Sequence, residues 1–335
     1  MYLTKDAMIT LIKDALIRNG VNEDIALKIA QTHTKSSYDG IYSHGTNRIP
    51  RFIDYIKKGW VIPNNKSTIE KQFGAITVLN GNLGPGVLNA FDAVDIAINS
   101  AKEYGIGLVG LNNTTHWMRG GSYGLYAASQ GYVLISWTNT EANMPPWGGI
   151  EPRLGNNPFV MATPSSDGKV TILDMAMSQY AYGKLETTRL ANQQLPYPGG
   201  FDKDGNLTSD PGLIEESLRI LPTGYWKGSS FSFMLDILGA ILTNGNQVTE
   251  LDELRKGSCT ACSQVFIVID PKKITDTNRI DEIISKTKAY IKSSKLDNNT
   301  KEVLYPGEDF SIYNKLHDEK GIFIDDAIYE QIKAL

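Results

Sequence analysis

Apolar residues recur at helical spacing through the first part of the chain. In residues 5–19 they lie on one face, and a second helix is expected from Asn22, which offers a cap before an acidic first turn. A third helix is expected over "TNRIPRFIDYIKKG" (46–59), with Pro50 in its first turn. His44 therefore lies in the loop that enters this third helix.

From about residue 74 the pattern changes to short apolar runs bounded by turn residues, which is typical of buried strands. The runs are "GAITVL" (74–79), "IGLVGL" (106–111), "YVLISWT" (132–138), "VTILDMAM" (170–177) and "VFIVID" (265–270). Helical patterns separate them, at "GVLNAFDAVDIAINSAKEYG" (86–105), "GSYGLYAASQG" (121–131) and the buried-looking "GSSFSFMLDILGAILTNG" (228–245). Amphipathic helices return at "RIDEIISKTKAYIKSS" (279–294) and "DDAIYEQIKAL" (325–335).

This succession predicts an α/β (α+β) chain in which helical ends flank a central sheet. Residues 1–73 are expected to form a helical segment that carries the His44 loop and packs with the C-terminal helices of residues 275–335. Residues 74–274 are expected to form the sheet-containing region. The stretch from 194 to 212, rich in proline and glycine, is expected to be a long loop with a role in function or at an interface.

Composition and charge are those of an ordinary soluble protein, with 41% hydrophobic residues, a net charge of -4 and a pI of 5.7. The chain has no basic block, so nucleic acid is not an expected partner. It has no long apolar window and no signal-peptide pattern, so we expect a cytoplasmic protein without a membrane span. Cys259 and Cys262 are expected to be free thiols in a reduced compartment.

The motif "GIGLVG" (105–110) matches the GxGxxG dinucleotide fingerprint letter for letter. That fingerprint requires a strand before the glycines and a helix that begins within them. Here a long predicted helix ends at Gly105 and a strand follows, with no acidic residue about 20 positions further on. We therefore predict that this motif does not bind a dinucleotide.

Several polar loops follow the predicted strands. In "NNTTHWMRGGSYG" (112–124), His116 and Arg119 precede a glycine-rich helix start that favours phosphate or carboxylate, although a glycine-rich surface turn fits as well. The Asn, Pro and Gly residues of "WTNTEANMPPWGG" (137–149) and "RLGNNPF" (153–159) suit either sugar hydroxyls or turns. Lys227 is equally compatible with an anion contact and with a solvated side chain.

The remaining histidines, His33 and His317, lie on charge-rich helical segments and are expected at the surface. Residues with metal-ligand spacing are not found in the sequence, so no metal site is expected. A serine-nucleophile signature such as GxSxG is not present either.

Two loops, "YSHGTNRIPRF" (42–52) and "HWMRGGSYG" (116–124), resemble those of the malate/L-lactate dehydrogenase-like oxidoreductases, a family separate from the Rossmann dehydrogenases. The resemblance runs nearly from end to end. Its supporting stretches are "WTNTEANMPPWGG", "DMAMSQYAYG", "LPYPGGFDKDGNLTSDPG", "ILPTGYWKGSSFSFMLDIL" and "PGEDF".

The resemblance implies an NAD(P)H-dependent 2-keto acid reductase that works as a homodimer, with a largely antiparallel central sheet that binds the dinucleotide without a Rossmann motif. It implies that His44 donates the proton, that Arg48 holds the substrate carboxylate and that His116 lines the same pocket. The implied cofactor contacts are Val170, Thr171, Ile172, Leu173, Asp174, Met175, Ala176, Trp226, Lys227, Gly307, Glu308 and Asp309.

The residue types suit these tasks. An imidazolium titrates near neutral pH, which suits His44 to proton donation, and the guanidinium fork of Arg48 matches a carboxylate. NADH is expected over NADPH, because the acids Asp174, Glu308 and Asp309 would repel a 2′-phosphate if they lie near the ribose.

The resemblance at "HWMRGGSYG", "MPPWGG" and "GYWKGS" favours a 2-keto sugar acid as the small-molecule substrate. The alternatives within the family are a malate, lactate, ureidoglycolate or sulfolactate dehydrogenase, or an imine reductase. Outside it, the alternatives are a non-catalytic sugar-acid binding protein and, less favoured, a metal-dependent hydrolase.

Overall fold

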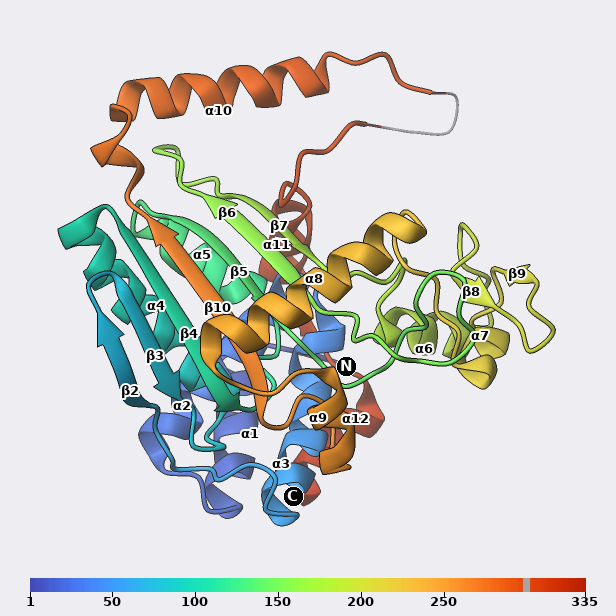
Figure 1. Cartoon of the computed structure of the whole chain (residues 1–335). Coiled ribbons are helices and arrows are strands. Elements are labelled where there is room, and N and C mark those ends of the chain that lie inside the picture. The colour runs from blue at the N-terminus through green and yellow to red at the C-terminus, as the bar shows by residue number, and fades with distance from the viewer. Residues whose placement is uncertain (298–301) are drawn as a thin grey trace.

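The structure, a computed structural model, describes residues 1–297 and 302–335 (Figure 1). The α-helices are α1 (Lys5–Arg18), α2 (Glu23–Tyr38), α3 (Ile49–Lys57), α4 (Gly86–Tyr104), α5 (Gly121–Ser129), α6 (Tyr182–Leu190), α7 (Pro211–Ser217), α8 (Trp226–Thr243), α9 (Val248–Leu254), α10 (Thr277–Lys292), α11 (Phe310–Lys320) and α12 (Asp326–Ala334). The 3-10 turns are η1 (Tyr42–His44), η2 (Thr46–Arg48) and η3 (Pro271–Lys273).

A seven-stranded sheet forms the centre of the molecule, in the order β2-β3-β4-β10-β5-β6-β7. Its strands are β2 (Thr68–Phe73), β3 (Ile76–Asn80), β4 (Ile106–Thr114), β5 (Val133–Thr138), β6 (Phe159–Thr163), β7 (Thr171–Met175) and β10 (Cys262–Ile269). Every neighbouring pair is antiparallel except β3 and β4. The predicted α/β class with a largely antiparallel sheet is therefore confirmed.

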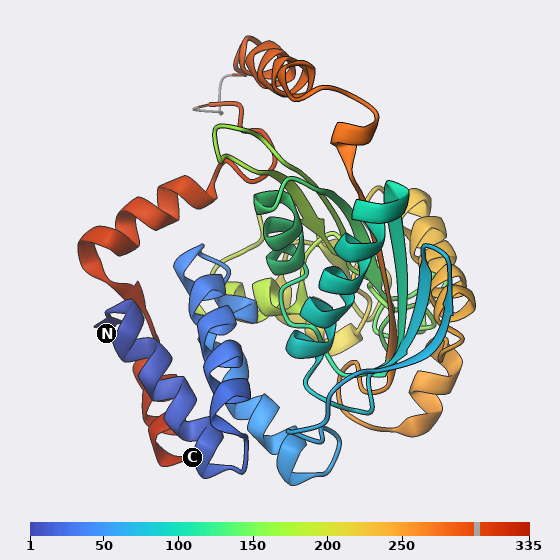
Figure 2. The same ribbon diagram turned by 90° about the vertical axis from the view of Figure 1, so that its left-hand side faces the viewer.

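Helices cover the sheet on both faces. Helices α4 and α5 lie on one face and α8 on the other, as the two views show (Figures 1 and 2). The two glycines of "GIGLVG" that lie within β4 allow this close packing: a Cβ at Gly107 would lie 2.1 Å from the carbonyl oxygen of Ala97 in α4, and one at Gly110 would lie 2.2 Å from that of Leu242 in α8. The prediction that this motif is a strand after a helix is confirmed, and its glycines serve helix–sheet contact.

A second core joins the two ends of the chain. Helices α1, α2 and α3 pack with α12, and β1 (Tyr2–Leu3) pairs with β11 (Ile322–Phe323). Helix α10 does not join this core; it stands beside the β6–β7 hairpin, where the backbone amide of Ser166 donates to Asp281 at 3.0 Å (Figure 1). Of the elements after residue 275, α11, β11 and α12 contact the N-terminal helices.

Four local features differ from what the sequence predicts: one helix cap, two strands and one loop. Asn22 precedes α2, but its side chain makes no capping hydrogen bond. Strands β2 and β6 were not among the predicted runs; all six residues of β2 are exposed, so β2 lacks the apolar signal of a buried strand. The stretch from 194 to 212 holds a short hairpin, β8 (Gly200–Phe201) with β9 (Leu207–Thr208), and the start of α7.

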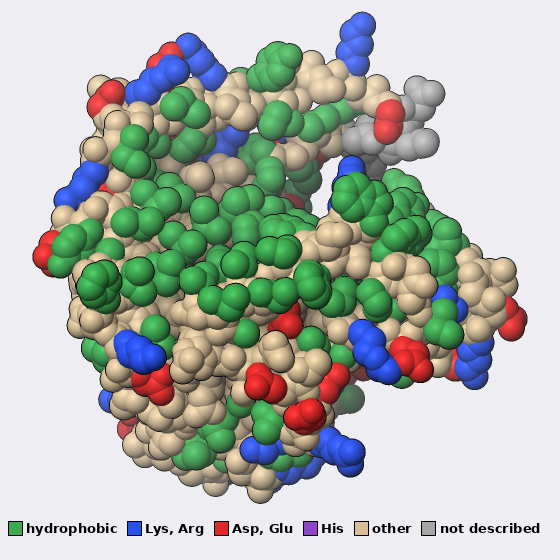
Figure 3. All heavy atoms as spheres, viewed as in Figure 1, with side chains coloured by type: hydrophobic (Ala, Val, Ile, Leu, Met, Phe, Trp, Pro, Cys, Tyr) green, Lys and Arg blue, Asp and Glu red, His purple; other side chains and the backbone are tan. Residues whose placement is uncertain are grey.

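Helix α8 was expected to be buried, and it is buried on one side only. Its outer side carries Phe231, Phe233, Met234, Leu238 and Ile241, each at least 38% exposed. Together with Met161 of β6 these side chains belong to the large apolar area on this side of the molecule (Figure 3). An apolar helical sequence predicts burial, but it does not indicate whether the helix is covered by its own chain or by another molecule.

Candidate active site

The loop that carries His44 is anchored by α2. The ring nitrogen Nδ1 of His33 lies 2.9 Å from the carbonyl oxygen of Gly45, and the hydroxyl of Ser37 accepts from the amide of Thr46 at 3.0 Å. A Cβ at Gly45 would lie 2.1 Å from the Ser37 hydroxyl oxygen, so only glycine fits this approach. The chain then passes through η2 into α3, which places His44 and Arg48 on consecutive turns.

His33 is buried, at 1% exposure, so its predicted surface position is wrong. Its Nδ1 must donate to the Gly45 carbonyl, and its Nε2 is enclosed without a hydrogen-bond partner in the described part of the chain. Burial lowers the pKa of His33 to about 4. Helical periodicity alone could not predict this, because the covering loop comes from later residues.

We expect this histidine to make stability fall in acid. Its pKa is lower in the folded than in the unfolded chain, so the unfolded state binds more protons as the pH falls from about 6.5 towards 4. The stabilisation is fully present above about pH 6.5. Between pH 7.5 and pH 5 the free energy of unfolding falls by about 2 kcal/mol. The free energy of unfolding in urea should be measured at pH 7.5 and pH 5 for the wild type and for His33→Asn, which keeps a donor near the position of Nδ1. The fall between the two pH values should be smaller in the variant by about 2 kcal/mol. An equal fall in both proteins would show that His33 does not cause the loss of stability.

His44 is half-buried and has one free ring nitrogen. Its Nδ1 lies 3.0 Å from the hydroxyl of Ser43, and Nε2 has no hydrogen-bond partner among residues 1–297 and 302–335. Burial, followed by the positive charge of Arg48, lowers the pKa of His44 to about 3. Burial and the Arg48 charge thus both favour the neutral ring of His44.

Arg48 and His116 complete this group. The Nε of Arg48 donates to the carbonyl oxygen of Ser43 at 2.7 Å. The His116 ring lies 5.9 Å from the His44 ring, centroid to centroid. The backbone amide of Met118 donates to His116 Nδ1 at 2.8 Å, so the neutral ring carries its proton on Nε2. His116 can thus donate a hydrogen bond to a ligand beside His44.

Two cavities meet at His44. We call the first the Arg48 cavity; it has a volume of about 450 Å³ and is lined by His44, Arg48, His116, Glu141, Asn143 and Tyr182, among others. We call the second the β7 cavity; it has a volume of about 600 Å³ and lies between β7 and the segment from Leu304 to Phe310. His44, Trp117, Asn156, Pro158 and Ala181 line both. Both volumes lie in the range of small-molecule sites.

The β7 cavity gathers about half of the cofactor residues implied by the resemblance. Ile172, Leu173, Asp174, Ala176, Gly307 and Asp309 line it. The segment is held to the edge of β7 by a hydrogen bond of 3.1 Å from the Ile172 amide to the Pro306 carbonyl. Gly307 has a φ of +87°, and a Cβ there would lie 2.7 Å from the Ile172 side chain, so a glycine is required for this approach.

The other implied cofactor residues lie elsewhere. Val170 and Met175 pack into the hydrophobic cores, and Thr171 is not among the lining residues. Glu308 is not among the residues that line the cavity, and it forms an ion pair with Lys292. Trp226, which is 59% exposed, and Lys227 begin α8 on the solvent side and do not line either cavity.

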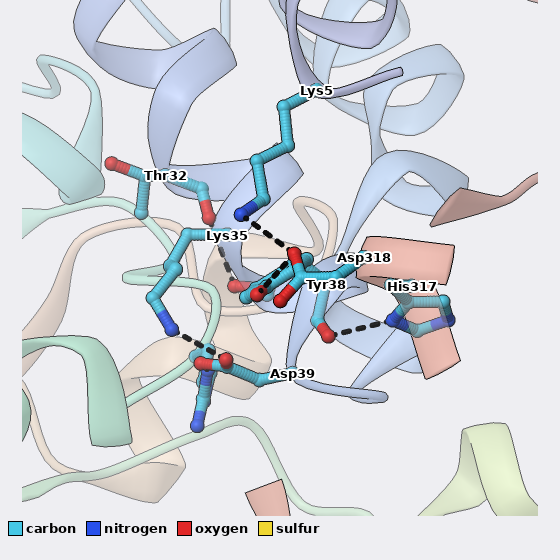
Figure 4. A network of polar contacts seen from close by, with 9 residues as sticks. Lys5, Thr32, Lys35, Tyr38, Asp39, His317 and Asp318 are labelled. Atoms are coloured by element: carbon cyan, nitrogen blue, oxygen red, sulfur yellow. Dashed lines mark hydrogen bonds and ion pairs between the residues drawn. The ribbon is translucent and has the colours of Figure 1, made fainter. Parts of the chain in front are cut away.

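The helix start in "HWMRGGSYG" binds an anion of the protein itself. The backbone amide of Gly121 donates to the Asp174 carboxylate at 2.7 Å, at the N-terminus of α5. Arg119 is buried and pairs with Asp39 at 2.6 Å; Asp39 also pairs with Lys35 at the end of α2 (Figure 4). The expected anion site is therefore filled by a side chain from β7, which fixes that strand against α5.

His317 is also buried, at 4% exposure, and its predicted surface position is wrong. Its Nδ1 lies 2.7 Å from the Tyr38 carbonyl, as Figure 4 shows, and its Nε2 lies 2.8 Å from the Tyr42 hydroxyl. Helix α11, which follows the β7 cavity, is thereby joined to the turn that contains His44.

Sequence reasoning missed several residues of the site, among them Glu141, Asn143, Asn156, Tyr182 and Arg51. Three of them lie in the polar loops after β5, where turn formation explained them equally well. The Asn143 amide nitrogen donates to Asn156 at 3.0 Å and to Thr140 at 3.2 Å, and Tyr182 donates to the Asn143 carbonyl. The predicted free thiols Cys259 and Cys262 are confirmed, and both are buried.

A cationic clamp, a titratable ring and an adjoining larger cavity suit chemistry on a small carboxylic acid beside a cofactor. The sequence matches the profile of the malate/L-lactate dehydrogenase family over residues 3–333. The chain is 40% identical over 335 residues to the 2,3-diketo-L-gulonate reductase of Escherichia coli O127:H6 (strain E2348/69 / EPEC), with 100% of both proteins covered. The chain belongs to the malate/L-lactate dehydrogenase family and is an oxidoreductase.

Solved structures agree with this assignment. A sulfolactate dehydrogenase from Methanocaldococcus jannaschii superimposes with a TM-score of 0.87 at 32% identity, covering 100% of this chain and 96% of that chain. A malate dehydrogenase from Entamoeba histolytica has a TM-score of 0.93 over 100% of this chain and 96% of that chain. At 24% identity this similarity supports the fold only. Within the described residues, no helix has the length and apolar character needed to cross a bilayer.

Proposed function

We propose that this protein is an NADH-dependent reductase of a 2-keto sugar acid, with 2,3-diketo-L-gulonate reduced to 3-keto-L-gulonate as the favoured reaction. The observation that carries the proposal is the position of His44 on the wall shared by the Arg48 cavity and the β7 cavity. The full-length similarity to the Escherichia coli reductase supports the choice of substrate.

Three residues of the Arg48 cavity have distinct tasks in this reaction. Arg48 grips the substrate carboxylate through its planar fork, which fixes the position of the neighbouring keto carbon. His44 Nε2 delivers a proton to the keto oxygen as that oxygen becomes an alcohol. His116 Nε2 donates a hydrogen bond to the same keto oxygen, and this bond orients the keto group.

The low pKa of free His44 fits this scheme once the substrate is considered. In the ligand-free site burial and Arg48 hold that pKa at about 3, so the ring is neutral. A substrate carboxylate on Arg48 cancels the nearby positive charge and raises the pKa, so the ring takes up the proton that it later donates. The neutral ring serves equally as the base for the reverse reaction.

The residues of the β7 cavity fit a nicotinamide dinucleotide, which supplies the hydride when bound. The cavity adjoins His44, as hydride transfer to the keto carbon requires. Ile172, Gly307 and Asp309 would hold the cofactor, while Trp226 and Lys227 remain proposed contacts outside the cavity of a single chain. The residues that line this cavity would therefore position the cofactor next to His44.

NADH is the proposed cofactor because carboxylates dominate the β7 cavity. Asp174 and Asp309 line it, and its buried cation, Arg119, is already paired with Asp39. We expect kcat/KM to be about tenfold or more higher with NADH than with NADPH, since a 2′-phosphate near these acids is repelled. Initial rates with both cofactors at one substrate concentration series would test this; a preference for NADPH would contradict it.

We infer that the protein is a cytoplasmic homodimer. The outer side of α8 carries exposed large apolar side chains, and a broad apolar area is visible on this side of the molecule (Figure 3). Patches of this kind mark protein–protein contacts, and a second copy of the chain is the partner that the family resemblance implies. A dimer built on this face would also cover Trp226 and Lys227 at the start of α8.

An NADH-oxidation assay tests the proposed function. The protein is mixed with NADH and, in separate reactions, with 2,3-diketo-L-gulonate, pyruvate and oxaloacetate. We expect the highest kcat/KM with 2,3-diketo-L-gulonate. A clear preference for oxaloacetate or pyruvate would favour the alternative, a malate- or lactate-type dehydrogenase, and no oxidation with any acid would favour a binding protein.

A further inference from the structure

The Arg48 cavity contains a carboxylate as well as its arginine. Glu141 lies in the loop after β5 and lines this cavity together with Arg48 and His44. Its Oε1 accepts from the Ser258 hydroxyl at 2.9 Å and its Oε2 from the Cys259 backbone amide at 2.8 Å. The carboxylate is therefore held in one orientation, with lone pairs left over for a ligand.

No cation neutralises this carboxylate within residues 1–297 and 302–335, where Glu141 takes part in none of the ion pairs. Neutral hydrogen-bonding groups line the cavity beside it, among them Asn143, Thr140 and Tyr182, and the cations of the cavity are Arg48 and Arg51. Burial raises the pKa of Tyr182 to about 12, and the negative charge of Glu141 adds to this shift.

Glu141 places a fixed negative charge in a cavity that is proposed to bind anionic substrates, so the two charges must be reconciled. A tail with hydroxyl groups would donate hydrogen bonds to Glu141, and charge-assisted bonds of this kind are strong. A second carboxylate on the substrate would instead meet a like charge, which a cavity of low dielectric makes costly. With Arg48 to bind one carboxylate and Glu141 fixed in the same cavity, the site distinguishes a hydroxylated monoacid from a dicarboxylic acid.

We propose that Glu141 is the specificity-determining residue of the Arg48 cavity, accepting hydrogen bonds from the hydroxylated tail of a keto monoacid and excluding keto dicarboxylates. This inference rests on the proposed reductase function and adds the residue that selects the substrate class. Ser258 and the Cys259 amide act as positioning groups, since both donate hydrogen bonds to the Glu141 carboxylate.

The test is a substrate-specificity measurement on Glu141→Gln with NADH. This variant is isosteric: its amide oxygen can accept from the Cys259 amide while its NH₂ group donates to the Ser258 hydroxyl, so the loop stays tethered. We expect kcat/KM for oxaloacetate to rise about tenfold and that for 2,3-diketo-L-gulonate to fall about three- to tenfold. 2-Ketobutyrate, with a short apolar tail, should change by less than about twofold.

Two further variants make the result decisive. Glu141→Asp keeps the negative charge and should keep the rejection of oxaloacetate. Glu151→Gln removes a charge from the same loop at an exposed residue that pairs with Arg153, and should leave all three values unchanged. Equal changes for all three acids in Glu141→Gln, or none, would overturn the role of Glu141. Absence of NADH oxidation by the wild type with all three would overturn the proposed function, and this inference with it.

Discussion

Replacement of His44 by alanine should lower kcat for reduction of 2,3-diketo-L-gulonate by about 10²-fold or more. The ring has one nitrogen engaged by Ser43 and the other free toward the cavities, which is the arrangement of a proton donor. Without it the alcohol oxygen must take its proton from water. Steady-state rates at saturating NADH and substrate measure the change.

The binding of NADH serves as the control for this variant. His44 borders the β7 cavity, whereas the bulk of that cavity comes from β7 and the segment from Leu304 to Phe310. The Kd for NADH, measured by the quenching of tryptophan fluorescence, should therefore change by less than about threefold. A His44→Ala protein that keeps full turnover would show that another group supplies the proton.

Replacement of Arg48 by alanine should raise KM for the keto acid about 10- to 100-fold, because charge-assisted hydrogen bonds to the carboxylate are lost. Arg48→Lys should recover only part of the affinity, since an ammonium group cannot form the two parallel bonds of a guanidinium. The loss of the bond from Arg48 to the Ser43 carbonyl should also loosen the His44 turn and lower kcat by a smaller factor.

Arg153→Ala is the matched control for Arg48. Arg153 is exposed and pairs with Glu151, so its removal changes the net charge equally without touching the Arg48 cavity. Its KM should stay close to that of the wild type. If Arg48→Ala left KM unchanged as well, the carboxylate would have to be held by another group, with Arg51 the next cation on the cavity wall.

The sequence supported the architecture where the apolar pattern is strong. The helices α1 and α4 and the strands β4, β5 and β10 lie within two or three residues of the predicted ranges. The glycine motif could be rejected as a dinucleotide site because the order of helix and strand is local information. The exposed strand β2 gave no comparable signal, since none of its residues is buried.

The sequence predicted those site residues that lie close together along the chain, but not the contacts between distant segments. His44 and Arg48 are four positions apart, so their joint presence in one cavity followed from a helix start between them. The burial of His33 depends on Gly45, twelve positions later, and that of His317 on Tyr38 and Tyr42 near the other end of the chain. The pKa of His44 depends first on its burial and then on the charge of Arg48, and both are set only by the folded chain.

The most direct test of the account is the position of the transferred hydrogen. The wild-type protein is given 2,3-diketo-L-gulonate with NADH that carries two deuterium atoms on the reactive carbon of the nicotinamide, and the product is examined by NMR and mass spectrometry. Because Arg48 fixes the carboxylate, the carbon next to it should receive the hydride, so we predict one deuterium on carbon 2. Deuterium on carbon 3, or a product without deuterium, would contradict the account.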